Sequence, residues 1–255
     1  MIKFFRKIRQ QLLTDNKFSK YLLYAIGEIL LVVIGILIAL QINNQNDLKK
    51  SRAKEINYLT NIKTDLKITV QELNRYINVR TQSIEAANTI LEHIEGKPIT
   101  DIEAFNELGV PIYNWTKFYQ NNNTFQELLN SGNLALISND SIKNMLLDIE
   151  SLYKKLKSEE DHYRFDSEEL IYKPLYNTMD LNPMVNNFLY RLSNGTEGRD
   201  IKLSEDYFKS YLTNTNLKNG FVMTILEFST MNAQMEEMIQ MSENLLALID
   251  SEITK

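Results

Sequence analysis

The chain contains no cysteine, and among its 255 residues it has only eight glycines and four prolines. Without cysteine there can be no disulfide, lipid-modified cysteine anchor, thiol catalysis or cysteine metal site. Glycine and proline mark most turns and interruptions, so their scarcity favours long uninterrupted helices. No stretch alternates apolar and polar residues for long enough to predict a sheet, and we expect an all-α fold.

Charge is distributed unevenly along the chain. Residues 1–42 carry six basic and two acidic side chains, a net charge of +4, whereas residues 43–255 carry a net charge of −9. A protein that binds nucleic acid needs a basic surface, and an acidic domain does not provide one. We therefore expect no nucleic-acid partner.

The longest apolar run covers residues 22–40 and contains one charged residue, Glu28. A helix of this length spans about 28 Å, which matches the hydrocarbon core of a bilayer. A cleaved signal peptide has a shorter apolar region that ends in small residues, whereas this run leads into the polar sequence QINN. The sequence predicts an uncleaved signal anchor, with one transmembrane helix at residues 21–43 embedded in the lipid bilayer.

Basic residues predict the orientation of this helix. Six lysines and arginines precede the apolar run and four follow it closely, which favours a cytoplasmic N-terminus. We expect a single-pass protein of the bacterial inner membrane with a periplasmic domain at residues 44–255. Residues 1–20 have two open interpretations: a basic amphipathic helix lying on the anionic leaflet, or a basic tail that only sets topology.

Three residues of the predicted span, Glu28, Gly35 and Ala39, share one helical face. Gly35 and Ala39 form a small-xxx-small pattern, which lets transmembrane helices approach closely. A charged side chain inside lipid is costly and commonly functional. Three interpretations of Glu28 stay open: it packs against a helix of a homo-oligomer or protein partner, it reaches water at the interface, or it carries protons.

The rest of the chain has the pattern of three long amphipathic helices. We predict one through residues 36–95, continuous with the span, a second at 141–172 that Pro174 ends or kinks, and a third at 221–253. Between the first two, the sequence Thr124-Phe125-Gln126-Glu127 predicts a helix start with a capping box. Long helices with short connectors predict an elongated antiparallel bundle of coiled-coil type.

Two segments carry a family resemblance. The first is the anchor block, with MIKFFRKIR at residues 1–9 and YAIGEILLVVIGILIALQINN at residues 24–44, and the second includes TFQEL at 124–128 and SGNL at 131–134. In these segments the chain resembles a family of uncharacterised, N-terminally anchored proteins common in Bacteroidota. The resemblance implies a bacterial, membrane-anchored protein and brings no assigned activity.

Two clusters could bind a metal ion. Four side chains at helical spacing offer an imidazole and carboxylates for a divalent cation: Glu159, His162, Asp166 and Glu169. Four thioethers that suit Cu(I) come from Met231, Met235, Met238 and Met241. The ordinary interpretations are a solvated charged helix face and methionines that fill a core. We assign no metal ligand, cofactor or catalytic residue, and without a recognisable catalytic motif we expect no enzyme.

The candidate partner-binding residues belong to two loops, because loops on rigid scaffolds often carry recognition. They are Tyr113, Trp115, Phe118, Tyr119, Ser131, Gly132 and Asn133. The alternative is that the aromatic side chains fill one end of the core. We predict a membrane-anchored interaction, scaffold or sensor-like module. Two alternatives remain: an accessory subunit of a transporter or proton-driven complex that uses Glu28, and a metal-binding periplasmic protein.

Overall fold

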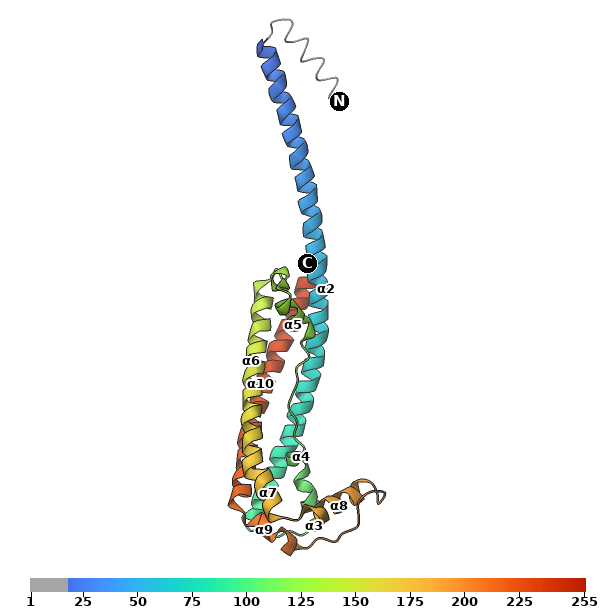
Figure 1. Ribbon diagram of the computed structural model, residues 1–255, viewed down its shortest axis with the longest axis vertical. Helices are drawn as coiled ribbons and strands as arrows, with labels where there is room; N and C mark the ends of the chain where they lie inside the picture. The colour runs from blue at the N-terminus through green and yellow to red at the C-terminus, as the bar shows by residue number, and fades with distance from the viewer. Residues whose placement is uncertain (1–17) are drawn as a thin grey trace. The chain divides into compact units, whose positions relative to one another are not determined.

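The computed structural model describes residues 18–255, and every regular element in that range is helical, which confirms the all-α prediction (Figure 1). Residues 1–17, where most of the predicted basic segment falls, lie outside the described range. The elements in chain order are α2 (Phe18–Ile94), α3 (Ile102–Leu108), α4 (Val110–Tyr113), α5 (Asn123–Asn130), the 3-10 turn η1 (Asn133–Leu136), α6 (Asp140–Ser167), the π-helical turn η2 (Glu168–Tyr172), α7 (Lys173–Thr178), α8 (Leu181–Leu192), the 3-10 turn η3 (Glu205–Phe208), α9 (Lys209–Leu212) and α10 (Thr215–Ile253).

Helix α2 contains the apolar run and continues without interruption into the acidic part of the chain, as predicted. The chain divides into two compact units within this helix, one that ends at Asn57 and one that comprises Tyr58–Lys255. The helix ends at Ile94, and Gly96 follows it with a left-handed φ of +109°. There the Lys97 amide donates to the Glu92 carbonyl at 3.0 Å, a bond that satisfies a terminal carbonyl of the helix.

In the second unit, α10 runs antiparallel to both α2 and α6. Side-chain contacts show this, because early residues of α10 meet late residues of its neighbours. The contacts with α2 are Lys218–Glu95, Asn232–Thr81 and Asp250–Lys63. Those with the start and end of α6 are Glu252–Asn139 and Thr224–Tyr163. Helices α2 and α6 therefore run in the same direction, and a segment between them must return the chain.

That segment, residues 111–127, is here called the return segment. It runs back along α2, and its hydrogen bonds follow the helix in reverse order. They join Ser83 to Pro111, Tyr76 to Lys117, Thr69 to Asn121, Asp65 to Thr124 and Tyr58 to Glu127, at 2.9–3.1 Å. Much of the segment is not helical, so side chains of α2 supply the partners that its backbone would otherwise lack.

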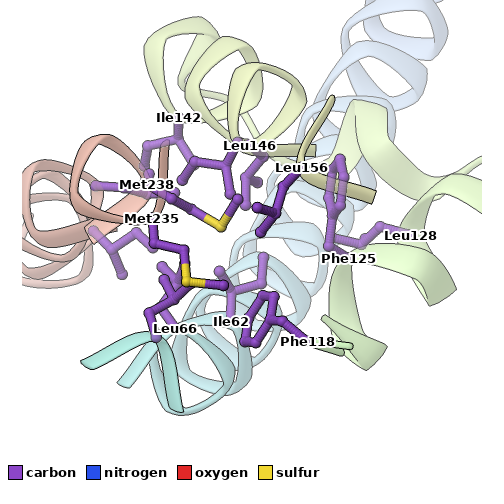
Figure 2. Packing of buried hydrophobic residues seen from close by; sticks show 14 of the residues in the cluster. Ile62, Leu66, Phe118, Phe125, Leu128, Ile142, Leu146, Leu156, Met235 and Met238 are labelled. Carbon is purple, nitrogen blue, oxygen red and sulfur yellow. The ribbon is translucent and has the colours of Figure 1, made fainter. Parts of the chain in front are cut away.

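Two apolar clusters form the interior of the second unit. The first lies between α2, α6, α10 and the return segment, and Figure 2 shows Met235 and Met238 reaching into it beside Leu146 and Leu156. The second joins the end of α2 to the short helices and the start of α10, around Phe105, Phe208 and Phe221. Met231, Met235 and Met238 are fully buried among apolar side chains, which agrees with the core-filling interpretation of the methionine run.

One predicted cap is absent, and the second long helix changes to a π-helical turn just before Pro174, where an end or a kink was predicted. The α5 helix begins at Asn123, and Thr124 does not cap it; its amide donates to Asp65 of α2 instead. The π-helical turn η2 precedes Pro174, and α7 begins with this proline in its first turn. A proline has no amide hydrogen to donate within a helix. Amides in the first turn of a helix have no intrahelical partner in any case, so a proline is tolerated there.

One buried ion pair joins these elements. Arg80 of α2 donates to Glu160 of α6, and both side chains are almost fully buried. The same Glu160 oxygen accepts the Phe118 amide of the return segment at 2.8 Å. Lys157 donates to the other oxygen at 2.7 Å and to the Phe118 carbonyl at 2.9 Å. Burial lowers the pKa of Arg80, and the charge of Glu160 opposes this shift.

We predict that Arg80→Ala lowers the free energy of unfolding by about 3 kcal/mol, because it leaves Glu160 buried with only Lys157 as a charged partner. Urea unfolding of the 255-residue chain in detergent, followed by circular dichroism, measures the change. The control is Arg75→Ala on the same helix, where the exposed pair with Glu72 is worth less than about 1 kcal/mol. Equal effects of the two substitutions would contradict the prediction.

Candidate functional site

The apolar run of α2 remains exposed along its length. Fourteen large apolar side chains from Leu22 to Ile42 are each at least 43% exposed. Among the described residues, α2 is the one helix that is long and apolar enough to cross a membrane, and no part of its apolar window is buried. An apolar surface of this extent is typical of a segment that contacts lipid or another protein.

The predicted packing face lies within this exposed run. A side-chain carbon added at Gly35 would meet no other atom within 4 Å, and Ala39 is exposed. Glu28 is half-buried. The face therefore has room for a second helix to approach closely at Gly35 and Ala39.

The predicted aromatic loop is divided between the interior and the surface. Phe118 is fully buried in the first apolar cluster. Trp115 packs edge-on against Tyr163, with the ring centres 4.9 Å apart. Tyr119 is 72% exposed, and the Lys157 ammonium lies 4.3 Å from its ring centre. Of these three aromatic residues, Tyr119 is the most exposed, Trp115 is partly buried and Phe118 is fully buried.

Tyr113 and the Ser131–Asn133 turn do not form one site. Tyr113 belongs to α4, and its hydroxyl lies 3.0 Å from the Tyr211 hydroxyl in the second apolar cluster. Gly132 has a left-handed φ of +71°, and the turn it makes follows α5, which lies at the opposite end of the second unit from α4 (Figure 1). The structure therefore separates the two predicted binding loops.

A pocket of about 360 Å³ lies beside Tyr113. Its walls come from α3, α4, η2, α7 and α8, and they are mainly apolar. The lining includes Tyr113, Leu175, Tyr176, Met184, Val185 and Phe188. Tyr172 donates from its hydroxyl to the Tyr113 carbonyl at 2.9 Å. Burial raises the pKa of Tyr113 above its ordinary value, so this phenol stays neutral.

The pocket has one polar group without a hydrogen bond. The side-chain amide of Asn106 donates to the Met184 carbonyl at 3.2 Å and to Asn187 at 3.3 Å, while its oxygen is buried and accepts no hydrogen bond from the described residues. A mainly apolar pocket of this kind suits a small apolar group. The pocket was not predicted from the sequence, although the apolar residues of α8 recur at helical spacing: Leu181, Met184, Val185, Phe188 and Leu189.

A second polar cluster joins α6 to α10. His162, Asp166 and Glu227 each place one ligand-type atom within 4.8 Å of the others. The His162 Nδ1 atom lies 3.2 Å from a Glu227 oxygen, and the Glu227 side chain is only 8% exposed. The sequence put His162 and Asp166 on one helical face but could not supply Glu227. Glu169, which the same pattern included, pairs with Lys173 instead.

The electrostatics of this cluster are unfavourable for Glu227. Burial, together with hydrogen bonding and charge repulsion from Asp166, raises its pKa to about 7, and His162 opposes these effects. Neither Glu227 oxygen accepts a hydrogen bond of good geometry from the described residues. A group of this kind is expected where a proton or a cation is held.

These features define an all-helical protein with one long apolar N-terminal helix. Residues 28–181 match a family of unknown function, DUF6090. The match covers more than half of the chain, and the chain belongs to this family. The matched range contains Arg80, Glu160, His162 and Asp166 but ends before Glu227. No curated protein and no solved structure matches the chain.

Adjacent positions in the return segment test whether its aromatic residues support the fold or contact a partner. We predict that Phe118→Ala costs about 3–5 kcal/mol of unfolding free energy, because it empties a fully buried site. Tyr119→Ala should cost less than about 1 kcal/mol, the worth of an exposed cation–π contact. Chemical unfolding of the two variants measures both values, and a reversed order would show that Phe118 does not support the core.

Proposed function

We propose that this chain is a membrane-anchored helical interaction module. In this proposal the apolar run of α2 crosses the bacterial inner membrane once, and residues 44–255 form a helical bundle in the periplasm. The observation that carries the proposal is the exposed apolar surface between Leu22 and Ile42. Water would meet apolar atoms on every face of that helix, at a cost of roughly 25 cal/mol for each Å², whereas lipid removes that cost.

The packing of the second unit supports the anchoring role. Residues 58–255 contain two apolar clusters built from their own side chains, so this unit does not need the apolar run to complete its core. The run is therefore available to lipid. The excess of basic residues before it favours a cytoplasmic N-terminus, and the net charge of −9 after it makes a nucleic-acid role unsuitable.

An interaction role fits the second unit better than a catalytic one. The buried pair between Arg80 and Glu160 holds α2, α6 and the return segment together. On this scaffold the structure offers a mainly apolar pocket that Asn106 helps to line. Apolar surface with few polar groups binds an apolar side chain or small molecule. Partner contact through the Gly35 face of the membrane helix is the second element of the proposal.

Membrane topology tests the anchor directly, because the chain has no native cysteine and single cysteines report position cleanly. We predict that Asp200→Cys, at an exposed position, reacts with a membrane-impermeant maleimide in cells whose outer membrane alone is permeabilised. Lys3→Cys should react only after the inner membrane is lysed. The unmodified protein should stay with vesicles through a carbonate wash.

The opposite labelling pattern would reverse the orientation and leave the anchor intact. Release of the chain by carbonate, or equal labelling of both cysteines before lysis, would overturn membrane anchoring itself. The cysteine-free parent chain controls for labelling of other groups.

Cysteine crosslinking tests association through the membrane helix. We predict that Gly35→Cys forms a disulfide-linked dimer in membranes under mild oxidation, because the glycine position leaves space for a close helix approach. The matched control is Leu37→Cys, two residues on and about 200° around the helix, which should remain monomeric. Equal dimer yields at both positions would indicate random collision, and absence of any dimer from Gly35→Cys would remove the homo-oligomer version.

A further inference from the structure

The cluster of His162, Asp166 and Glu227 has the geometry of a cation site. His162 and Asp166 are four residues apart on α6, so their side chains project from one face. Glu227 reaches the same point from α10, which runs antiparallel to α6. One atom from each of the three side chains lies within 4.8 Å of the others. Two ligands about 2.2 Å from one ion are at most about 4.4 Å apart, so small side-chain rotations bring these atoms to metal-binding distance.

Contacts within the described residues do not give the Glu227 carboxylate of this cluster a hydrogen bond of good geometry. The Glu227 side chain is 8% exposed, and neither of its oxygens accepts a hydrogen bond from the described residues. A buried carboxylate that has only the His162 ring, 3.2 Å away, as a nearby donor is costly. Asp166 adds a second acid at the same point, and His162 provides compensation only when it is protonated.

The neighbouring cations are engaged with other acids. On the same stretch of α6 and η2, Arg164 pairs with Glu168 at 3.3 Å and Lys173 pairs with Glu169. Arg80 of α2 pairs with Glu160. Because these three basic side chains pair with other acids, they do not balance the negative charge at Glu227 and Asp166.

We propose that His162, Asp166 and Glu227 bind a divalent first-row transition-metal ion between α6 and α10. The ligand set determines the class of ion. One imidazole nitrogen and two carboxylates suit Zn²⁺, Co²⁺ or Mn²⁺, whereas Mg²⁺ and Ca²⁺ prefer ligands that are all oxygen. His162 is 60% exposed, so the ion is reachable from solvent and water completes its coordination.

Close packing of α10 against η2 helps to hold these ligands in fixed positions. Gly220 of α10 packs so closely on η2 that an added side-chain carbon would lie 2.5 Å from Ile171. This contact holds α10 against the turn that follows Asp166. An ion bound by all three side chains would link α6 and α10 directly, two helices that otherwise meet here through side-chain packing and the Tyr163–Thr224 hydrogen bond.

The experiment uses the 255-residue chain in detergent at pH 8, after removal of metal with a chelator, because ligand carboxylates and imidazole must be deprotonated. Zn²⁺ is titrated by calorimetry, and Co²⁺ binding is followed by its visible absorption bands. We expect one equivalent of metal per chain. Glu227→Gln, which preserves side-chain size, and His162→Ala should each weaken Zn²⁺ binding at least tenfold and change the Co²⁺ spectrum.

Matched controls come from the same chain. Glu236→Gln removes an exposed acid from α10, and His93→Ala removes the other histidine; both should leave affinity and spectrum unchanged. Circular dichroism and the urea midpoint of each metal-free variant establish that it is folded. If His162→Ala fails to fold, His162→Gln replaces it.

Three results would overturn the proposal. The first is no saturable Zn²⁺ binding to the parent chain. The second is binding that Glu227→Gln and His162→Ala leave unchanged, which would place the metal elsewhere on the surface. The third is Mg²⁺ binding as tight as Zn²⁺ binding, which would contradict the assigned ligand chemistry. None of these results depends on membrane topology, so the proposed anchor stands or falls separately.

Discussion

The second unit depends on one buried ion pair, between Arg80 and Glu160. A buried charge pair is tolerated only when its remaining donors and acceptors are also paired. Glu160 meets this requirement through the Phe118 amide and Lys157, and Arg80 lies 5.6 Å from the ring centre of Phe228. The pair therefore fixes α2, α6 and the return segment in one register, because a one-residue slip of any of them would leave a charge buried alone.

The sequence predicted an antiparallel bundle, but α2 and α6 run in the same direction because residues 111–127 return the chain between them. Helical periodicity identified α2, α6 and α10 because burial imposes a repeat of 3.6 residues on each. It contained no signal for residues 111–127, which run antiparallel to α2 while making few internal hydrogen bonds. Their backbone partners are side chains of α2, such as Tyr76 and Thr69, and such pairs have no local pattern. The same cause explains why Thr124 looked like a cap: its amide is paired by the distant Asp65.

Local sequence patterns also gave incomplete predictions where tertiary packing determines the structure. The third long helix was predicted from residue 221, yet α10 begins at Thr215 with Asn214 as its cap and contains Gly220. The glycine stands inside the helix because Ile171 leaves no room for a side chain there. At the candidate cation site, His162 and Asp166 were visible as a pair at helical spacing. Glu227 was one acid among many, since its burial and missing hydrogen bonds arise only when α10 packs on α6.

Glu160 and His162 stand two residues apart, and this closeness links the fold to the candidate site. Glu160 faces Arg80 in the interior, while His162 lies largely in solvent beside Glu227. One turn of α6 thus carries two groups in different electrostatic settings. The charge of Glu160 is balanced within the protein, whereas His162, two residues later, belongs to a cluster with an excess of acidic side chains. Because the buried pair holds that turn rigidly, Glu227 cannot escape its acidic neighbour by a small shift of α6. The acidic environment of Glu227 is therefore a consequence of the fold, and the cation that we propose there would offset it without a change of register.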